Sequence, residues 1–249
     1  MVSLKEVSTS RAPEDYLRMA LQAQSPKQRA RMAQLGLDAL DGGESALDTE
    51  VLLLRQLYLA HLESERFAQA ADVALRMARL GPLKDVAHHD AARALQALGD
   101  LEGAVAQQRL AARASPPERR SFHYWSLGTL LQVSGDWRGA VAALERGERW
   151  AHVDRPLLKA HRAWIRLEAG QAVRGLDVIA NELERARCRE GYGQFVLGML
   201  RHAMGDHRRA AVHLRAFLRR NAAADVGKAI TLREELRRAR AVLAQLESD

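Results

Sequence analysis

Small residues recur along this chain at a nearly constant distance. The five that open the second helix of each predicted pair are Ala70, Ala104, Ala140, Gly175 and Ala210. They are separated by 34, 36, 35 and 35 residues. A fixed period of this length indicates a stack of supersecondary units, because each unit is too small to bury a core alone and gains one from its neighbours.

Two further features keep the same period. The turns before the five small residues are Glu65-Arg66, Gly99-Asp100, Gly135-Asp136, Gly170-Gln171 and Gly205-Asp206. The positions twelve residues before them are Tyr58, Ala92, Gly128, Ala163 and Gly198. Antiparallel helices approach closely where one presents glycine or alanine, and glycine readily takes the left-handed conformation that ends a helix. The pattern therefore predicts helix–turn–helix pairs.

The third pair carries the pattern most clearly. Its segment 124–140, YWSLGTLLQVSGDWRGA, places Tyr124 before Leu127 and Gly128, and Ala140 follows that glycine by twelve residues. This spacing resembles the tetratricopeptide repeat, and degenerate copies extend over about residues 48–222. The resemblance implies an all-α fold, a right-handed superhelical solenoid of antiparallel helix pairs.

The chain divides into four segments on these patterns. Residues 1–12 are polar and aperiodic and are expected to be flexible; residues 13–47 form an N-terminal helix pair, either a diverged repeat or a cap. In that pair Ser25, Pro26 and Gln28 predict a helix start with a capping box. Residues 48–222 hold five tetratricopeptide-like repeats. Residues 223–249 hold a capping helix, for which a dimer seam is the alternative.

The apolar stripe of this last helix consists of Leu232, Leu236, Ala239, Leu243 and Leu246.

The fourth repeat departs from the others. Charged residues occupy its nominal core positions, at Lys159, Arg162 and Arg166. Sliding the helix by one residue instead gives a common apolar face of Leu157, Ala160, Trp164 and Leu167. We therefore expect a one-residue deletion in the turn near Gly170.

Charge is unevenly distributed along the chain. The formal net charge is +7, yet residues 185–240 alone hold fourteen Arg and Lys against five Asp and Glu. A basic C-terminal third could attract nucleic acid or an acidic partner. A solvated arginine-rich face is the other interpretation.

No motif for catalysis, for a cofactor or for a metal is present, so we predict that the protein is not an enzyme. The adjacent His88 and His89 diverge on a helix and cannot share a metal in the usual way. The single cysteine, Cys188, excludes an internal disulfide and fits a reducing compartment. The sequence shows neither a signal-peptide pattern nor an apolar run of membrane-spanning length, which predicts a cytoplasmic protein.

The resemblance also implies where a partner binds, because the first helix of each pair lines the concave groove in this family. The groove positions selected on this basis are Arg55, Leu59, His89, Arg93, Phe122, Trp125, Thr129, Tyr192, Phe195 and Met199. Aromatic residues and arginine often carry binding energy at interfaces. The sequence thus predicts a non-catalytic adaptor that binds a peptide segment or helix, with apolar anchors and some acidic character. Packing of some of these aromatics between repeats is the alternative.

Overall fold

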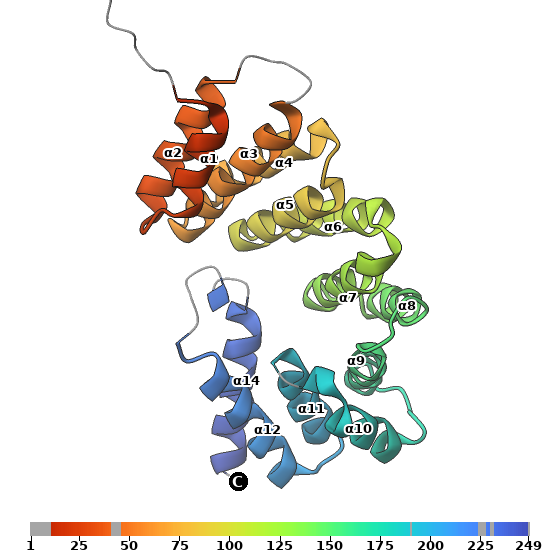
Figure 1. The fold of residues 1–249 in the computed structure, drawn as a ribbon. Helices are drawn as coiled ribbons and strands as arrows, with labels where there is room; N and C mark the ends of the chain where they lie inside the picture. The colour runs from red at the N-terminus through yellow and green to blue at the C-terminus, as the bar shows by residue number, and fades with distance from the viewer. Residues whose placement is uncertain (1–10, 41–45, 190, 224–227, 230–231, 249) are drawn as a thin grey trace, which may run out of the picture. The chain divides into compact units, whose positions relative to one another are not determined.

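The structure is a computed structural model that describes residues 11–40, 46–189, 191–223, 228–229 and 232–248 (Figure 1). The described residues form helices and turns, with no strand among them. The chain comprises two compact units, residues 1–94 and 95–249.

The first unit is built from helices that pack in sequence order. They are α1 (Pro13–Leu21), α2 (Pro26–Asp38), α3 (Ala46–Glu63), α4 (Phe67–Leu80) and the greater part of α5 (Lys84–Leu98). Helix α1 packs on α2 and α3, and α3 packs on both α2 and α4. The buried residues of the first unit include Ala20, Ala33, Leu54, Leu57 and Met77.

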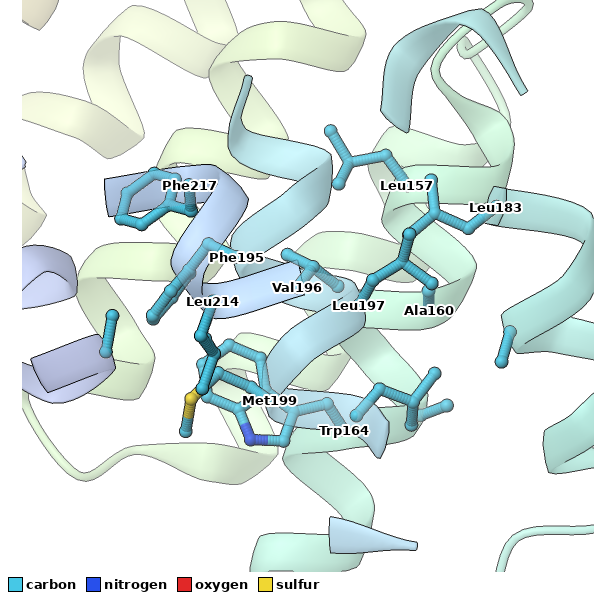
Figure 2. Packing of buried hydrophobic residues seen from close by; sticks show 14 of the residues in the cluster. Leu157, Ala160, Trp164, Leu183, Phe195, Val196, Leu197, Met199, Leu214 and Phe217 are labelled. Carbon is cyan, nitrogen blue, oxygen red and sulfur yellow. The ribbon is translucent and has the colours of Figure 1, made fainter. Parts of the chain in front are cut away.

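The second unit is also built from helices that pack against their neighbours in the chain. Its helices are α6 (Leu101–Ala114), α7 (Pro117–Val133), α8 (Trp137–Glu148), α9 (Arg155–Glu168), α10 (Leu176–Arg185), the short 3₁₀ helix η1 (Arg187–Arg189), α11 (Tyr192–Ala203), α12 (His207–Arg220) and α14 (Arg233–Ser248). A core of leucine and aromatic side chains lies between α9, α11 and α12, with Phe195 beside Leu214 and Phe217 (Figure 2). The predicted all-α helical-repeat solenoid is confirmed.

All five predicted turns have one hydrogen-bonding pattern. At the third, Gly135 N–H donates to the carbonyl of Gln132 at 3.1 Å, and Asp136 N–H donates to that of Leu131 at 2.9 Å. This pair of bonds is the Schellman motif, whose left-handed residue satisfies carbonyls that the helix end leaves open. The left-handed residues are Glu65, Gly99, Gly135, Gly170 and Gly205.

The residue after the turn glycine starts the next helix in three of these turns. The carboxylates of Asp100 and Asp136 each accept a hydrogen bond at 2.8 Å from the backbone N–H three residues on. Asp206 does the same at 3.2 Å. Such N-caps satisfy donors that the first helical turn leaves open. One Gly-Asp dipeptide thus ends one helix and begins the next.

The small position on the first helix brings the two helices of a pair together. A Cβ on Gly128 would lie 2.8 Å from Leu144 Cγ, and one on Gly198 would lie 2.6 Å from Leu214 Cγ. Both leucines are fully buried. Side chains at these positions would therefore push α7 from α8 and α11 from α12.

The fourth repeat corrects one expectation and supports another. Its turn has the same hydrogen bonds as the others, from Gly170 N–H to Leu167 and from Gln171 N–H to Arg166, so the predicted one-residue deletion is wrong. The irregularity follows the turn instead. Gln171 does not cap a helix, and α10 begins only at Leu176, after a left-handed Gly175.

The apolar face proposed for the first helix of this repeat is nevertheless correct. Leu157, Ala160 and Trp164 are buried, and Leu167 packs against the same core. The charged residues of α9 meet carboxylates instead of the core. Lys159 pairs with Glu182, while Arg162 and Arg166 both pair with Glu145.

The ends of the chain are described in part. The Ser25 hydroxyl accepts from Gln28 N–H at 3.2 Å, as predicted, but the Gln28 side chain accepts from Gln24 N–H instead of from Ser25. Helix α14 packs against α11 and α12 through the predicted apolar stripe, in which Ala239 and Leu243 are buried. Most of the segment predicted to be flexible, residues 1–10, lies outside the described residues. The four-part division of the chain stays a prediction.

We expect Gly198→Ala to lower the free energy of unfolding by about 1–2 kcal/mol, although alanine favours helix by up to about 1 kcal/mol. The overlap with Leu214 is the cause, so adding Leu214→Ala should cost less in the Gly198→Ala background than in the wild type. Urea unfolding followed by circular dichroism would measure this cycle. Strictly additive costs would contradict the close-approach explanation.

Candidate protein-binding surface

In the first unit, four of the predicted binding residues lie on α3 and α5 and are half-buried: Arg55, Leu59, His89 and Arg93. Arg55 Nε lies 3.8 Å from Asp90 Oδ2, and the Asp90 side chain is almost fully buried. Tyr58 lies fully buried on the same helix as Arg55. The arginine that was predicted to meet an acidic partner therefore already faces a carboxylate of its own chain.

Burial dominates the electrostatics of this cluster. It raises the pKa of Asp90 to about 6, although the nearby Arg55 and Arg93 act in the opposite direction. Burial, and then the Asp90 charge, raises the pKa of Tyr58 far above its ordinary value. The tyrosine therefore stays neutral at physiological pH. Neither its hydroxyl nor Asp90 Oδ2 has a hydrogen-bond partner among the described residues.

In the second unit, three predicted residues form a partly exposed surface on α7, here called the α7 aromatic surface: Phe122, Trp125 and Thr129. Phe122 is 44% exposed, and its ring centroid lies 6.1 Å from that of Trp125. The Trp125 ring in turn meets the edge of Tyr192 at 4.6 Å. The Thr129 hydroxyl donates to the Trp125 carbonyl at 3.2 Å. In this surface the Phe122 ring is accessible to solvent, and the Trp125 ring is held in place by its contact with Tyr192.

The remaining predicted residues are placed differently. Phe195 and Met199 are 1% and 3% exposed and belong to the core, so a groove-lining role for them is corrected. The reason is the close stacking of first helices, because Phe195 packs edge-on against Trp164 of α9 at 5.5 Å. Tyr192 lies behind Trp125 and donates its hydroxyl to Glu235 of α14 at 3.1 Å. These residues support the surface instead of forming it.

Helix α9 contributes residues that the sequence pattern did not select. The His161 ring stacks on Trp164 with centroids 5.1 Å apart, and His161 Nε2 lies 2.8 Å from Gln132 Oε1 of α7. Burial lowers the pKa of His161 to about 3, so this imidazole is neutral. The fourth repeat supplied none of the predicted groove residues, because its two possible registers place different residues on the groove face. The apolar face containing Trp164 was the one signal that pointed to them.

Helix α14 reaches back to the first helices of earlier repeats. Arg238 pairs with Glu168 of α9 at 2.6 Å, and its guanidinium lies over the Trp164 ring at 5.0 Å from the centroid. Glu235 accepts from Tyr192 on α11. Residues of α14 thus contact α9 and α11, and α7 carries the accessible part of the predicted surface in this unit.

Part of the positive charge in the basic C-terminal third is paired within the fold. Among the described residues, at least five of its thirteen arginines form ion pairs: Arg201, Arg209, Arg215, Arg237 and Arg238. Arg201 is 1% exposed and meets Asp177, Glu184 and Asp206, so it acts within the fold. These arginines lend no support to a nucleic-acid surface.

Three further findings concern metal ligands, the cysteine and membrane-spanning helices. Within the part of the chain that the structure describes, no three His, Cys, Asp or Glu side chains are grouped as metal ligands would be. Cys188 is half-buried, and burial raises the pKa of its thiol. None of the described helices is both apolar enough and long enough to cross a bilayer.

The chain resembles known proteins in structure. Neither a family model nor a curated protein matches the sequence. Among solved structures, the chain is similar to the apo form of RapI, with a TM-score of 0.52 and 12% identity over 94% of this chain and 84% of that one. It is also similar to a chain of the APC/C hetero-tetramer Cut9-Hcn1, with a TM-score of 0.53 and 14% identity over 93% of this chain and 54% of the other. Both neighbours contain tetratricopeptide repeats.

The chain has a tetratricopeptide-like fold. The degenerate repeats recognised in the sequence, the shared hydrogen-bonding pattern of the five turns and the structural neighbours agree on this point. At these identities the likeness establishes the fold of the chain and leaves its partner to be argued from its own residues.

Substitutions of core and of surface aromatic residues should differ in their effect on the free energy of unfolding. We expect Phe195→Ala to lower the free energy of unfolding by about 3–5 kcal/mol, because the ring is fully buried. Phe122→Ala should change it by less than about 0.5 kcal/mol. Urea titration of both variants provides the measurement. Equal costs would mean that Phe122 is also a core residue.

The Asp90 cluster predicts a pH dependence. The folded-state pKa of about 6 exceeds that of an unfolded aspartate, about 3.9, so the folded protein holds this proton more tightly. Its contribution to stability is greatest below pH 4 and is lost as pH rises towards 6. Asp90→Asn, which keeps the site neutral, should therefore be more stable than wild type at pH 7, with the difference vanishing near pH 4. Thermal melts across this range test it, and a less stable Asp90→Asn at pH 7 would show that the pair with Arg55 outweighs burial.

Proposed function

We propose that this protein is a non-catalytic scaffold of the cytoplasm that holds a peptide segment or helix of a partner protein on the first helices of its repeats. The observation that carries the proposal is the α7 aromatic surface, in which exposed Phe122 adjoins Trp125. Large aromatic side chains at rigid positions are the residues that most often dominate protein–protein binding energy.

Rigidity favours binding at this surface. Trp125 rests edge-on against Tyr192, and the Tyr192 hydroxyl is fixed by Glu235. Little side-chain freedom remains for Trp125 to lose when a partner binds, which lowers the entropic cost of association. Phe122 lies one helical turn before Trp125, so the two rings can receive apolar side chains spaced three or four residues apart on a partner helix.

The first unit offers a surface of different chemistry. Leu59 lies on α3 one turn beyond Arg55, and His89 and Arg93 are one turn apart on α5. The Arg55 side chain is 41% exposed, and its 3.8 Å separation from Asp90 leaves it able to meet a further carboxylate. This part of the proposal gives the partner some acidic character.

The structural neighbours support the proposal at the level of fold. One of them is a chain in the Cut9-Hcn1 hetero-tetramer, a complex of different proteins. Stacked helix pairs present extended surfaces without large rearrangement, which suits a scaffold.

The test places a photo-crosslinking residue, p-benzoylphenylalanine, at Phe122 and, as a control, at Val178. Val178 is 70% exposed on α10, away from the predicted positions. We expect position 122 to yield a discrete crosslinked protein from a lysate of the source cells, and position 178 to yield none. Adding Trp125→Ala to the position-122 variant should abolish the product. A product that survives this substitution, or one common to both positions, would argue against the α7 aromatic surface.

A further inference from the structure

A pocket of about 260 Å³ lies in the second unit between α6, α7 and α8. Its floor is apolar and includes the buried Leu127 and Leu131 of α7. Its walls are formed by the second helices of two successive pairs, α6 and α8, which both pack on α7 (Figure 1). None of the ten residues predicted to bind a partner lines it.

Sequence spacing explains why this space is open. On α6, Arg109 and Arg113 stand one turn apart, with the small Ala112 between them on the same face. On α8, the facing residues up to Arg146 are glycine and alanine, among them Ala142. Small residues on both walls leave room beside α7, and the longer, exposed arginines complete the lining.

The charge of the pocket is of one sign. Arg109, Arg113 and Arg146 are exposed, and no Asp or Glu is among the lining residues. No ion pair of these three arginines occurs within the described ranges. The nearby carboxylates of α8, Glu145 and Glu148, are instead bound by Arg162 and Arg166 of α9.

Three uncompensated guanidinium groups around an apolar floor suit a ligand that is both acidic and apolar. Guanidinium forms strong paired hydrogen bonds with carboxylates. The volume exceeds the roughly 150 Å³ that accommodates benzene, yet it falls below the range of about 300–1,000 Å³ usual for small-molecule sites. The size therefore fits one apolar side chain of a polypeptide better than a free cofactor.

We propose that this arginine pocket is a second protein-docking site, which takes a leucine or phenylalanine side chain flanked by Asp or Glu in an extended segment of a partner. The apolar side chain fills the space over Leu127 and Leu131. The flanking carboxylates pair with Arg109 and Arg113 on one wall and with Arg146 on the other. The pocket is independent of the α7 aromatic surface, so either site can fail without the other.

The experiment screens an array of short peptides, each with one Leu or Phe flanked by Asp and Glu, against the full chain and an Ala142→Trp variant. Ala142 lines the pocket and is exposed, so an indole there fills the space and leaves the charge unchanged. We expect a subset of peptides to bind the wild-type chain and to lose binding roughly tenfold or more in Ala142→Trp, measured by fluorescence anisotropy in solution.

A charge-matched pair of triple variants separates the pocket from general electrostatics. Arg109→Glu/Arg113→Glu/Arg146→Glu should abolish binding of the same peptides. Arg185→Glu/Arg208→Glu/Arg219→Glu changes exposed arginines of α10 and α12 by the same charge and should leave binding within about twofold. Circular dichroism confirms that each variant folds.

Three outcomes would overturn the proposal. The first is an array in which no peptide distinguishes the wild-type chain from Ala142→Trp. The second is equal weakening by both triple variants, which would indicate non-specific attraction to a basic protein. The third is displacement of the peptides by inorganic phosphate or by a single-stranded oligonucleotide whose own binding is lost in Ala142→Trp, which would assign the pocket to phosphate.

Discussion

The close approach of the two helices in a pair is the constraint on which the rest of this structure depends. Where Gly128 meets Leu144 and Gly198 meets Leu214, a missing Cβ lets a buried leucine of the second helix occupy the surface of the first. The Schellman turn then joins the two helices, because its left-handed residue ends the first helix and its hydrogen bonds satisfy carbonyls at that helix end. Stacking of pairs, and every surface that the pairs present, follows from this geometry.

Stacking in the second unit leaves its two faces with different chemistry. On the face formed by the first helices, aromatic rings from α7, α9 and α11 contact one another. Two residues of α14 contact these rings, Glu235 at Tyr192 and Arg238 at Trp164. Rings buried in this way become core, and the accessible surface narrows to Phe122 and its neighbours. On the face formed by the second helices, alanine and glycine leave space, and this space is lined by arginines that pair with no carboxylate of the described residues. A scaffold with both surfaces could hold two segments of one partner or two partners at once.

Buried charge is a further property of this fold. Arg201 of α11 is enclosed by Asp177 and Glu184 of α10 and by Asp206 of the turn between α11 and α12. Asp90 lies 3.8 Å from Arg55 and has a raised pKa. A buried ion is tolerated when hydrogen bonds and opposite charges replace its water. Arg201 satisfies this condition, and Asp90 satisfies it poorly. We therefore expect the polar cluster of the first unit to respond to pH. In the second unit the buried Arg201 links α11 to α10 and to the turn before α12.

The sequence by itself determined the repeat period, the turns and the helix class of this protein, because these depend on local chemistry. A left-handed glycine, a capping aspartate and a missing Cβ act within a few residues or across one helix pair, so Gly135, Asp136 and Gly128 could be interpreted without a structure. The candidate site could be predicted only in part. Phe122, Trp125 and Phe195 were all assigned to the groove. Phe122 and Trp125 do lie partly exposed on α7, but Phe195 is a core residue, because its burial depends on α9 and α12 and not on its own helix.

Only the tertiary structure decided which charges are compensated and which face retains space. Within the described residues, some arginines of the C-terminal third have carboxylate partners on distant helices, as Arg238 has with Glu168 of α9, and the sequence does not show such pairs. Arg109, Arg113 and Arg146 looked ordinary until three helices brought them around one pocket. Contacts between residues far apart in the chain depend on how whole helices are oriented, and a periodic pattern along one helix does not contain that information.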